Sequence, residues 1–301
     1  MSAKRHMVRV AAAQYPIDRF ATLAGYKEKL ARWVGEAVQN GAQLLVFPEY
    51  GAMEYSGSSG DAASDLAGCL AATADAMEEM GRAHAALARQ HDVHILAGSG
   101  PMSNDHGGYT NAARLYAPSG TSGTQLKCMM TPFEKTWGMS PGKALQMFDT
   151  ALGNIGIAVC YDCEFPLLVR AMAVAGADVI LVPACTEFIS GANRIRSAAL
   201  ARALENGCAV AVSPTVGDAV WSPAVDHNTG RAGIYVPAEQ GLSDTGILAE
   251  GELNRAGWIY ADIDLAHLRR IRTTGEMRNA LDWDLQPGAQ ASIRVDVVSL
   301  R

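Results

Sequence analysis

Short apolar runs alternate along the chain with longer stretches in which apolar residues recur every three or four positions. The short runs are rich in Val, Ile and Leu, and each of them predicts a buried strand. The longer stretches have the spacing of amphipathic helices. In the first half we predict strands at 8–15, 44–49, 93–98, 110–117 and 124–130, and helices at 22–40 and 74–91.

The second half of the chain repeats this alternation. We predict strands at 153–160, 179–184, 208–213, 231–236 and 257–263, and helices at 165–176, 191–206 and 265–272. Strands that alternate with helices are typical of an α/β protein in which helices cover a central sheet.

No linker or low-complexity segment divides the chain, so we expect one domain over residues 1–276. The nearest thing to a linker is the Gly- and Ser-rich segment 51–65, which follows directly after the candidate site residue Glu49. We interpret this segment as an active-site loop. Residues 277–301 are expected to form a C-terminal extension that packs on the domain or on a second subunit.

Charge and composition argue against several classes of partner. The formal net charge of −6 gives no electrostatic reason to expect nucleic acid or an anionic membrane. The sequence has no apolar run of ~18 residues that could span a bilayer, and the apolar stretch at 10–13 is too short for a signal peptide. The six cysteines lie mostly in apolar runs, which favours a reduced, cytoplasmic protein.

Charged side chains stand at the ends of two predicted strands. Glu49 follows five nearly continuous apolar residues, and open α/β sheets build their sites at such strand exits. Lys127 lies in an apolar run and must either reach solvent through its long stem or meet a partner, and Glu134 has the same ambiguity. On position alone, each of these residues is more often a solvated surface charge.

The strand predicted at 153–160 ends on Cys160, and the following residues turn into an amphipathic helix. A nucleophile at a strand–turn–helix bend has the geometry of a hydrolase elbow. The backbone N–H groups at the start of the helix lower the pKa of a thiol and can hold a developing oxyanion. The alternative, that Cys160 is a small buried hydrophobic residue, is equally compatible with this segment alone.

Taken together, these positions resemble the nitrilase superfamily of carbon–nitrogen hydrolases over roughly residues 8–265. The resemblance rests on Phe-Pro-Glu-Tyr at 47–50, on Lys127 with Thr-Pro-Phe-Glu at 131–134, and on Val-Cys-Tyr-Asp with Phe-Pro at 159–166. It implies a four-layer α-β-β-α sandwich that forms a homodimer or a larger homo-oligomer. We expect no cofactor and no metal.

The resemblance also implies a role for each site residue in the hydrolysis of a small amide. Glu49 would be the general base for the Cys160 thiol, and later for the water that hydrolyses the thioester. Lys127 and the backbone N–H of Tyr161 would stabilise the tetrahedral oxyanion. Glu134 matches a second carboxylate that members carry beside the Glu-Lys-Cys triad, where it positions the substrate nitrogen or the water.

The sequence departs from the family pattern at several positions. Many members have Arg-Lys-x-His around the lysine, whereas this chain has Leu-Lys-Cys-Met at 126–129, so the packing there must differ. Nitrile-specific members have Cys-Trp-Glu where this chain has Cys-Tyr-Asp at 160–162, which favours an amide over a nitrile. Carbamoylase-like members place arginines where this chain has Cys163 and Glu164, which disfavours an N-carbamoyl acid.

Other functions stay open on this evidence. A nitrilase or an N-acyltransferase would use the same triad, and an inactive binding protein would keep the same fold. Residues 160–163 also form a C-x-x-C motif, as in a metal-binding or redox protein, but no second such pair or nearby His pair completes a zinc site, and a thioredoxin-like motif would sit at the start of its helix in a smaller domain. We interpret His91 and His94 as surface residues, and no nucleotide-binding glycine motif is present.

The substrate pocket is predicted from residues that follow the triad positions. Tyr55 and Trp137 come shortly after Glu49 and Glu134, and would form walls around the acyl group. Glu187 would bind a cationic group of the substrate and Arg194 an anionic one. Each of these two charges is otherwise more often a surface residue beside a helix.

Overall fold

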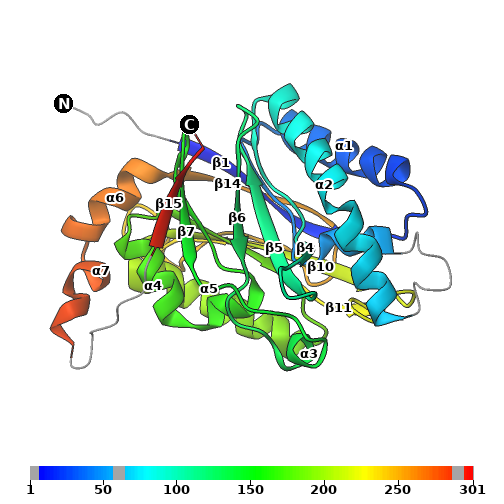
Figure 1. Ribbon diagram of the computed structural model, residues 1–301. Helices are drawn as coiled ribbons and strands as arrows, with labels where there is room; N and C mark the ends of the chain where they lie inside the picture. Colours follow the sequence, from blue (N-terminus) through cyan, green and yellow to red (C-terminus); the bar gives the residue numbers. More distant parts are fainter. Residues whose placement is uncertain (1–6, 57–64, 287–294, 301) are drawn as a thin grey trace.

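Strands and helices alternate along the chain much as the hydrophobic pattern predicts. The computed structural model describes residues 7–56, 65–286 and 295–300 (Figure 1). The strands are β1 (Met7–Pro16), β2 (Leu44–Val46), β3 (His94–Leu96), β4 (Gly100–Ser103), β5 (Tyr109–Tyr116), β6 (Ser122–Leu126), β7 (Leu145–Thr150), β8 (Gly153–Ile157), β9 (Val179–Ala184), β10 (Ala209–Asp218), β11 (His227–Asn228), β12 (Gly233–Tyr235), β13 (Ile247–Glu250), β14 (Gly257–Asp264) and β15 (Val295–Ser299). The helices are α1 (Leu23–Gln39), α2 (Leu66–His91), α3 (Pro132–Thr136), α4 (Pro166–Val174), α5 (Ile189–Asn206), α6 (Leu265–Thr274) and α7 (Asn279–Asp282), with 3₁₀ turns η2 (Cys160–Glu164) and η3 (Trp283–Leu285).

The strands form two halves of one strongly curved sheet. The order is β15-β7-β8-β9-β10-β1-β2-β3-β5-β4, and the halves meet where the ends of β1 and β10 pair in parallel. Alternate residues of β1 face opposite sides, as the period of two in a strand requires. Val8 and Val10 belong to the apolar cluster shared with β7–β10, whereas Ala11 and Ala13 belong to the cluster that contacts α1 and α2.

Helices cover the outer face of each half. In Figure 1, α1 and α2 lie over the β1–β5 half and α4 and α5 lie over the β7–β10 half. The layers therefore follow the order helix, sheet, sheet, helix, and the predicted α-β-β-α sandwich is confirmed. Helices α1 and α2 are each preceded by a capping residue, Thr22 and Asp65 respectively. The side chain of each capping residue accepts a hydrogen bond from a backbone N–H of the first helical turn.

The described part of the predicted C-terminal extension packs on the same chain. Strand β15 pairs in parallel with β7 along all of its residues. The guanidinium of Arg170 on α4 donates to the carbonyl oxygen of Ala280 at 2.9 Å and lies 4.6 Å from the ring centre of Trp283. Residues 287–294 and 301 of the predicted extension lie outside the described residues. The boundary at 277 stays a prediction.

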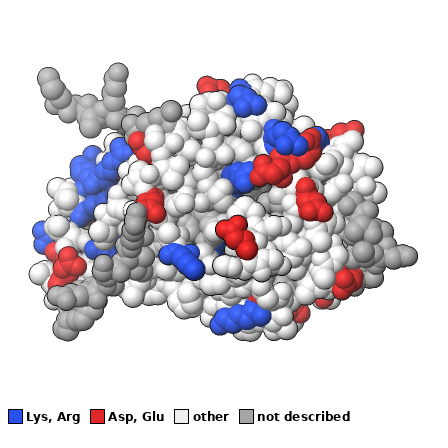
Figure 2. All heavy atoms as spheres, viewed as in Figure 1, with Lys and Arg blue, Asp and Glu red and all other residues white. Residues whose placement is uncertain are grey.

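Several predicted boundaries were wrong. The helix predicted at 74–91 begins at Leu66, and the strands predicted to reach 130 and 160 end at Leu126 and Ile157. Strands β4, β7, β11, β13 and β15 and helices α3 and α7 were not predicted. The interpretation of His94 as a surface residue was wrong, because it is buried in β3. Within the described ranges, the helices are all too short or too polar to cross a membrane. Figure 2 shows acidic and basic side chains interspersed over the viewed face, with basic ones gathered at the end where α6 lies.

Candidate active site

Glu49 lies at a sharp bend beyond the end of β2. The strand stops at Val46, and Tyr50 directly after Glu49 has a φ of 55°, a left-handed conformation that is uncommon for a residue with a side chain. The Tyr50 N–H donates to Ser99 Oγ at 3.1 Å, and Thr215 Oγ1 on β10 donates to the carbonyl oxygen of Glu49 at 2.7 Å. These bonds hold the bend from both halves of the sheet, and the Glu49 side chain is buried.

Lys127 follows directly after β6 and is held by its backbone. Its N–H donates to the carbonyl oxygen of Asn111 on β5 at 2.9 Å. The next two N–H groups, of Cys128 and Met129, donate to the buried carboxylate of Asp162, at 3.1 and 2.7 Å to Oδ1. Asp162 belongs to the turn that carries Cys160, so one carboxylate fixes the lysine segment against the cysteine segment.

Cys160 begins the 3₁₀ turn η2, three residues after the end of β8 at Ile157. Its φ of 48° is again left-handed. Its thiol is buried and lies 3.6 Å from the carbonyl oxygen of Cys185, which follows β9. Asp162 Oδ2 accepts from the N–H of Val159 at 3.2 Å, which fixes the residue before the bend.

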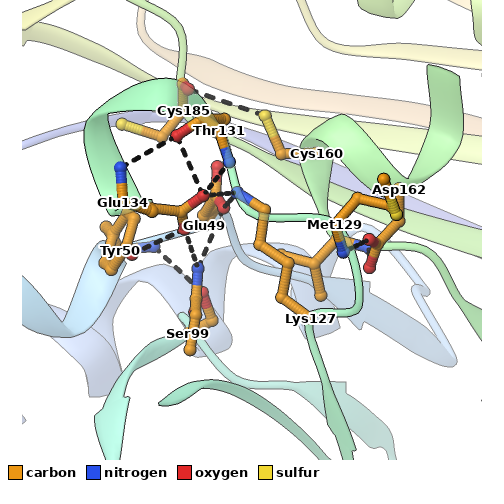
Figure 3. A network of polar contacts seen from close by, with 12 residues as sticks. Glu49, Tyr50, Ser99, Lys127, Met129, Thr131, Glu134, Cys160, Asp162 and Cys185 are labelled. Atoms are coloured by element: carbon orange, nitrogen blue, oxygen red, sulfur yellow. Dashed lines mark hydrogen bonds and ion pairs between the residues drawn. The ribbon is translucent and has the colours of Figure 1, made fainter. Parts of the chain in front are cut away.

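The side chains converge on one ammonium group, as Figure 3 shows. Lys127 Nζ lies 2.7 Å from Glu49 Oε1 and 2.7 Å from Glu134 Oε2. Asn111 Nδ2 donates to Glu49 at 2.9 Å and to Glu134 at 3.4 Å, and Tyr50 Oη donates to Glu134 at 2.8 Å. These five side chains, of Glu49, Tyr50, Asn111, Lys127 and Glu134, are all buried. A buried charge is stable only when it has hydrogen-bonded partners, and each charged group here has them.

Glu134 is fixed by its own helix start. Thr131 precedes α3 and forms a reciprocal capping box with it, because Thr131 Oγ1 accepts from the Glu134 N–H at 3.2 Å while Glu134 Oε2 accepts from the Thr131 N–H at 2.9 Å. The carboxylate thus has a rigid orientation on a helix of only five residues.

The two carboxyl groups have opposite pKa shifts. Burial raises the pKa of Glu49 to about 7, although the Lys127 charge works against this rise. Burial also acts to raise the pKa of Glu134, but Lys127 and the hydrogen bonds from Thr131 and Tyr50 outweigh it and lower that pKa below its usual value. Environments that separate the pKa values of two carboxyl groups typically assign them different roles. Glu49 can exchange a proton near neutral pH, and Glu134 stays ionised.

The cysteine and the lysine are both held in their protonated forms. The lowered thiol pKa that we expected from the start of a helix is wrong: burial, followed by the negative charge of Glu49, raises the pKa of the Cys160 thiol well above its usual value. Burial acts to lower the pKa of the Lys127 ammonium, but the negative charges of Glu49, Cys160 and Glu134 outweigh it, and the pKa is raised. A neutral thiol beside a carboxylate that titrates near pH 7 is suited to proton transfer at the moment of nucleophilic attack.

These residues lie in a cleft of about 630 Å³. Besides Glu49, Lys127, Glu134 and Cys160, the cleft is lined by four further residues that the sequence suggested, namely Tyr161, Trp137, Glu187 and Arg194. Arg194 Nε lies 3.3 Å from the Glu164 carboxylate, so its charge has a partner within the chain.

Tyr55 is the one predicted pocket residue that does not line this cleft. It packs against the apolar cluster beside α1. The cause is Glu54, which is buried, pairs with Lys29 on α1 and accepts from Tyr15 Oη at 2.9 Å. This network turns residues 51–56 toward the helix layer, and Tyr55 goes with them. Residues 57–64 of the predicted active-site loop lie outside the described residues.

Three residues of the site were missed by sequence reasoning. Asn111 stands near the start of the strand predicted at 110–117, and an amide that is buried in a strand must have partners, which was a usable signal. Tyr50 and Asp162 each follow a predicted site residue closely, but their roles depend on contacts with distant segments. Cys163 is fully buried in the core, and no group of His, Cys, Asp or Glu side chains suited to a metal ion occurs within the described ranges.

Comparison with known proteins identifies the family. The family model described as carbon-nitrogen hydrolase matches residues 9–273. The chain belongs to the carbon–nitrogen hydrolase family. The predicted resemblance and the predicted class of enzyme are therefore confirmed.

Individual relatives agree with this assignment. A probable hydrolase of Bacillus subtilis is 32% identical over 276 residues, which cover 91% of this chain but only 53% of that protein. A deaminated glutathione amidase of Synechocystis is 28% identical over 249 residues, covering 78% of this chain and 85% of that protein. The fold matches that of a double mutant of the amidase from Nesterenkonia sp. AN1 in complex with acrylamide, with a TM-score of 0.67, 22% identity, and coverage of 95% of this chain and 100% of that one.

Proposed function

We propose that this hydrolase cleaves a small amide through a thioester on Cys160. The observation that carries the proposal is the buried Lys127 ammonium, which bridges Glu49 and Glu134 at 2.7 Å each beside the thiol. An acyl-transfer site needs a nucleophile, a base and an oxyanion donor within reach of one carbonyl group. This cleft supplies all three.

The first half of the proposed reaction forms the thioester. Glu49 accepts the thiol proton as Cys160 Sγ attacks the carbonyl carbon of the amide. The negative charge that develops on the substrate oxygen is stabilised by Lys127 Nζ and by the N–H of Tyr161, the first residue after the nucleophile. When the tetrahedral intermediate collapses, Glu49 returns the proton to the leaving nitrogen, and ammonia or an amine departs.

The second half consumes water. Glu49 takes a proton from a water molecule, which attacks the thioester, and the same oxyanion donors stabilise the second tetrahedral intermediate. Collapse returns the proton to the Cys160 sulfur and releases a carboxylic acid. Glu134 stays ionised throughout and holds the Lys127 ammonium in position, because its lowered pKa keeps it charged.

The choice of an amide over a nitrile rests on two supports. Cys160 is followed by Tyr161 and Asp162, and not by the Trp-Glu pair that is typical of nitrile-specific members of the family that the chain resembles. The relatives with a named activity include a deaminated glutathione amidase, and similar structures include an amidase.

The test combines product release with detection of the intermediate. We expect ammonia release from one or more amides in a panel of aliphatic, aromatic, ω-amide and N-carbamoyl compounds and matching nitriles, and an acyl adduct in the intact mass of the wild type. Cys160→Ala should lack both, whereas Cys163→Ala, which changes a core thiol, should keep the adduct. Turnover that persists in Cys160→Ala would overturn the proposal, and turnover of nitriles alone would replace the amidase with a nitrilase.

We also propose that the protein forms a homodimer or a larger homo-oligomer. Support comes from apolar side chains that are exposed on neighbouring helices, including Leu167 (45% exposed) and Val174 (71%) on α4 and Leu204 (45%) on α5. Light scattering coupled to size-exclusion chromatography tests this directly, and a monomer at micromolar concentration would contradict it.

A further inference from the structure

The charged residues that line the cleft are unevenly balanced. Within the described residues, the acidic ones are Glu49, Glu134, Glu164, Glu187 and Asp226, and the Lys and Arg residues are Lys127 and Arg194. Lys127 pairs with Glu49 and Glu134, and Arg194 pairs with Glu164. Both cations therefore already have carboxylate partners, and Glu187 and Asp226 contribute negative charge that no described Lys or Arg pairs with.

Both carboxylates line the cleft from loops at the ends of strands. Glu187 comes shortly after β9, and Asp226 comes directly before β11. The exposed imidazole of His227, which also lines the cleft, lies near both of them. Its hydrogen bond with Asp218, at 3.0 Å, is the main cause that raises its pKa, and the charges of Asp226 and Glu187 add to the effect.

Cys185 lines the cleft as well, and its carbonyl oxygen contacts the Cys160 thiol. Burial and the charge of Glu49 raise the pKa of the Cys185 thiol, Lys127 opposes the rise, and Glu134 and, least, Asp226 add to it. Because Glu187 and Asp226 line the same cleft as Cys160, a charged group of a substrate bound there meets their charge.

Apolar surface accompanies these charges. The rings of Phe133 and Phe188 line the cleft and are 60% and 61% exposed. An exposed aromatic ring at a cleft suits the methylene chain of a ligand whose polar end is held elsewhere.

We propose that the cleft selects amides that carry a cationic group, an ammonium or a guanidinium, which Glu187 and Asp226 bind, over amides that carry a carboxylate. A carboxylate in that place would meet like charge, and Arg194 is not free to compensate because it pairs with Glu164. This inference rests on the proposed amide hydrolysis at Cys160 and names the substrate class for it. Specificity between charged ligands often comes from such repulsion as much as from attraction.

A substrate series that differs only in its terminal group tests the proposal. We would measure kcat/KM for 4-aminobutanamide, pentanamide and glutaramate, which carry a cation, a methyl group and an anion on the same three-methylene chain. We expect the cation to exceed the neutral amide by about tenfold and the anion to be the poorest, a tenfold ratio being about 1.4 kcal/mol. Turnover of glutaramate at least as fast as of pentanamide would overturn the proposal.

Charge removal at the two residues gives the matched variants. In the double variant Glu187→Gln with Asp226→Asn, the ratio of kcat/KM for 4-aminobutanamide over pentanamide should fall toward one. Glu28→Gln, which removes an exposed charge on α1 outside the cleft, should leave the ratio at its wild-type value. A ratio that does not change in the double variant refutes the assignment of these two residues.

A binding measurement separates this inference from the proposed reaction. Calorimetric titration of the Cys160→Ala protein with the same three compounds reads the charge preference without turnover. Tighter binding of the cation supports the inference even if the wild type hydrolyses none of the three, in which case the proposed amide hydrolysis is the part that fails for this series. Equal or tighter binding of glutaramate overturns the inference whatever the enzyme hydrolyses.

Discussion

Replacement of Lys127 by methionine removes the ammonium that lies between two buried carboxylates while keeping a side chain of similar length. Glu49 and Glu134 each lose a partner at 2.7 Å, and they then face each other as like charges. Removal of one partner from a buried ion pair typically costs about 3–5 kcal/mol. For a domain of this size, we expect the melting temperature to fall on the order of 10 °C.

The loss of stability in Lys127→Met should depend on pH in a defined direction. The pKa of Glu49 is about 7 in the presence of Lys127, and it rises further without the ammonium, as does that of Glu134. A carboxyl group whose pKa is raised in the folded state contributes stability that is fully present below its unfolded pKa and is lost as pH rises through its folded pKa. The deficit should therefore be small near pH 5 and reach its full size at alkaline pH.

Thermal unfolding from pH 5 to 9 measures this effect, with Lys143→Met, an exposed lysine, as the matched control. The double variant Lys127→Met with Glu134→Gln no longer has two facing charges, so its loss should be smaller than the sum of the single losses by about 0.5–3 kcal/mol. Lys127→Met that melts within 2 °C of the wild type at pH 8, or losses that simply add, would refute the reasoning. Activity should fall about 10²–10³-fold, as for other oxyanion donors.

Three further predictions concern the same group of residues. Asp162→Asn keeps the shape of the side chain but disturbs the hydrogen bonds that align the lysine segment with the cysteine segment. It should lower kcat about 10²-fold with KM nearly constant. Steady-state kinetics measure this, and a kcat within threefold of the wild-type value contradicts it. Because Glu49 must be ionised to act as a base and has a pKa of about 7, kcat/KM should rise with pH around a midpoint near 7, and a flat profile from pH 6 to 8 excludes that role. Tyr50→Phe removes the hydroxyl that donates to Glu134 at 2.8 Å and should lower the free energy of unfolding by about 1.5–3 kcal/mol. Urea unfolding measures this, with Tyr109→Phe on β5 as the comparison. Equal unfolding midpoints for the two variants would show that the bond contributes nothing.

The layers of the fold could be predicted from sequence because burial leaves a local pattern. The spacing of apolar residues predicted which segments are strands and which are helices that cover them, and in β1 adjacent residues face different clusters. The ends of the strands were harder to predict from the sequence. The strand predicted to run to 130 stops at Leu126 because Asp162, more than thirty residues away, takes the N–H groups of Cys128 and Met129. No residue near Leu126 signals that competition.

The residues of the candidate site also differ in how well the local sequence predicts them. Glu49, Lys127, Glu134 and Cys160 were found because their short motifs resemble those of a known family in the same order. Tyr55 was misplaced because its position depends on a buried ion pair between the chain after Glu49 and helix α1, which the local sequence does not reveal. Residues close in sequence to a catalytic group are thus poor guides to a pocket wall when the chain turns between them.

Strand β15 has a consequence for how the molecule stays in solution. It is the edge strand beside β7, and the Leu300 N–H after it donates to the carbonyl oxygen of Asp149 at 2.7 Å. Val295 and Val298 pack against the apolar cluster that contains Leu145, Met147 and Phe148 of β7. An edge strand with exposed apolar side chains readily pairs with another chain. Shortening the protein before Val295 would make β7 the edge strand and uncover part of that cluster, so we expect the shortened protein to aggregate.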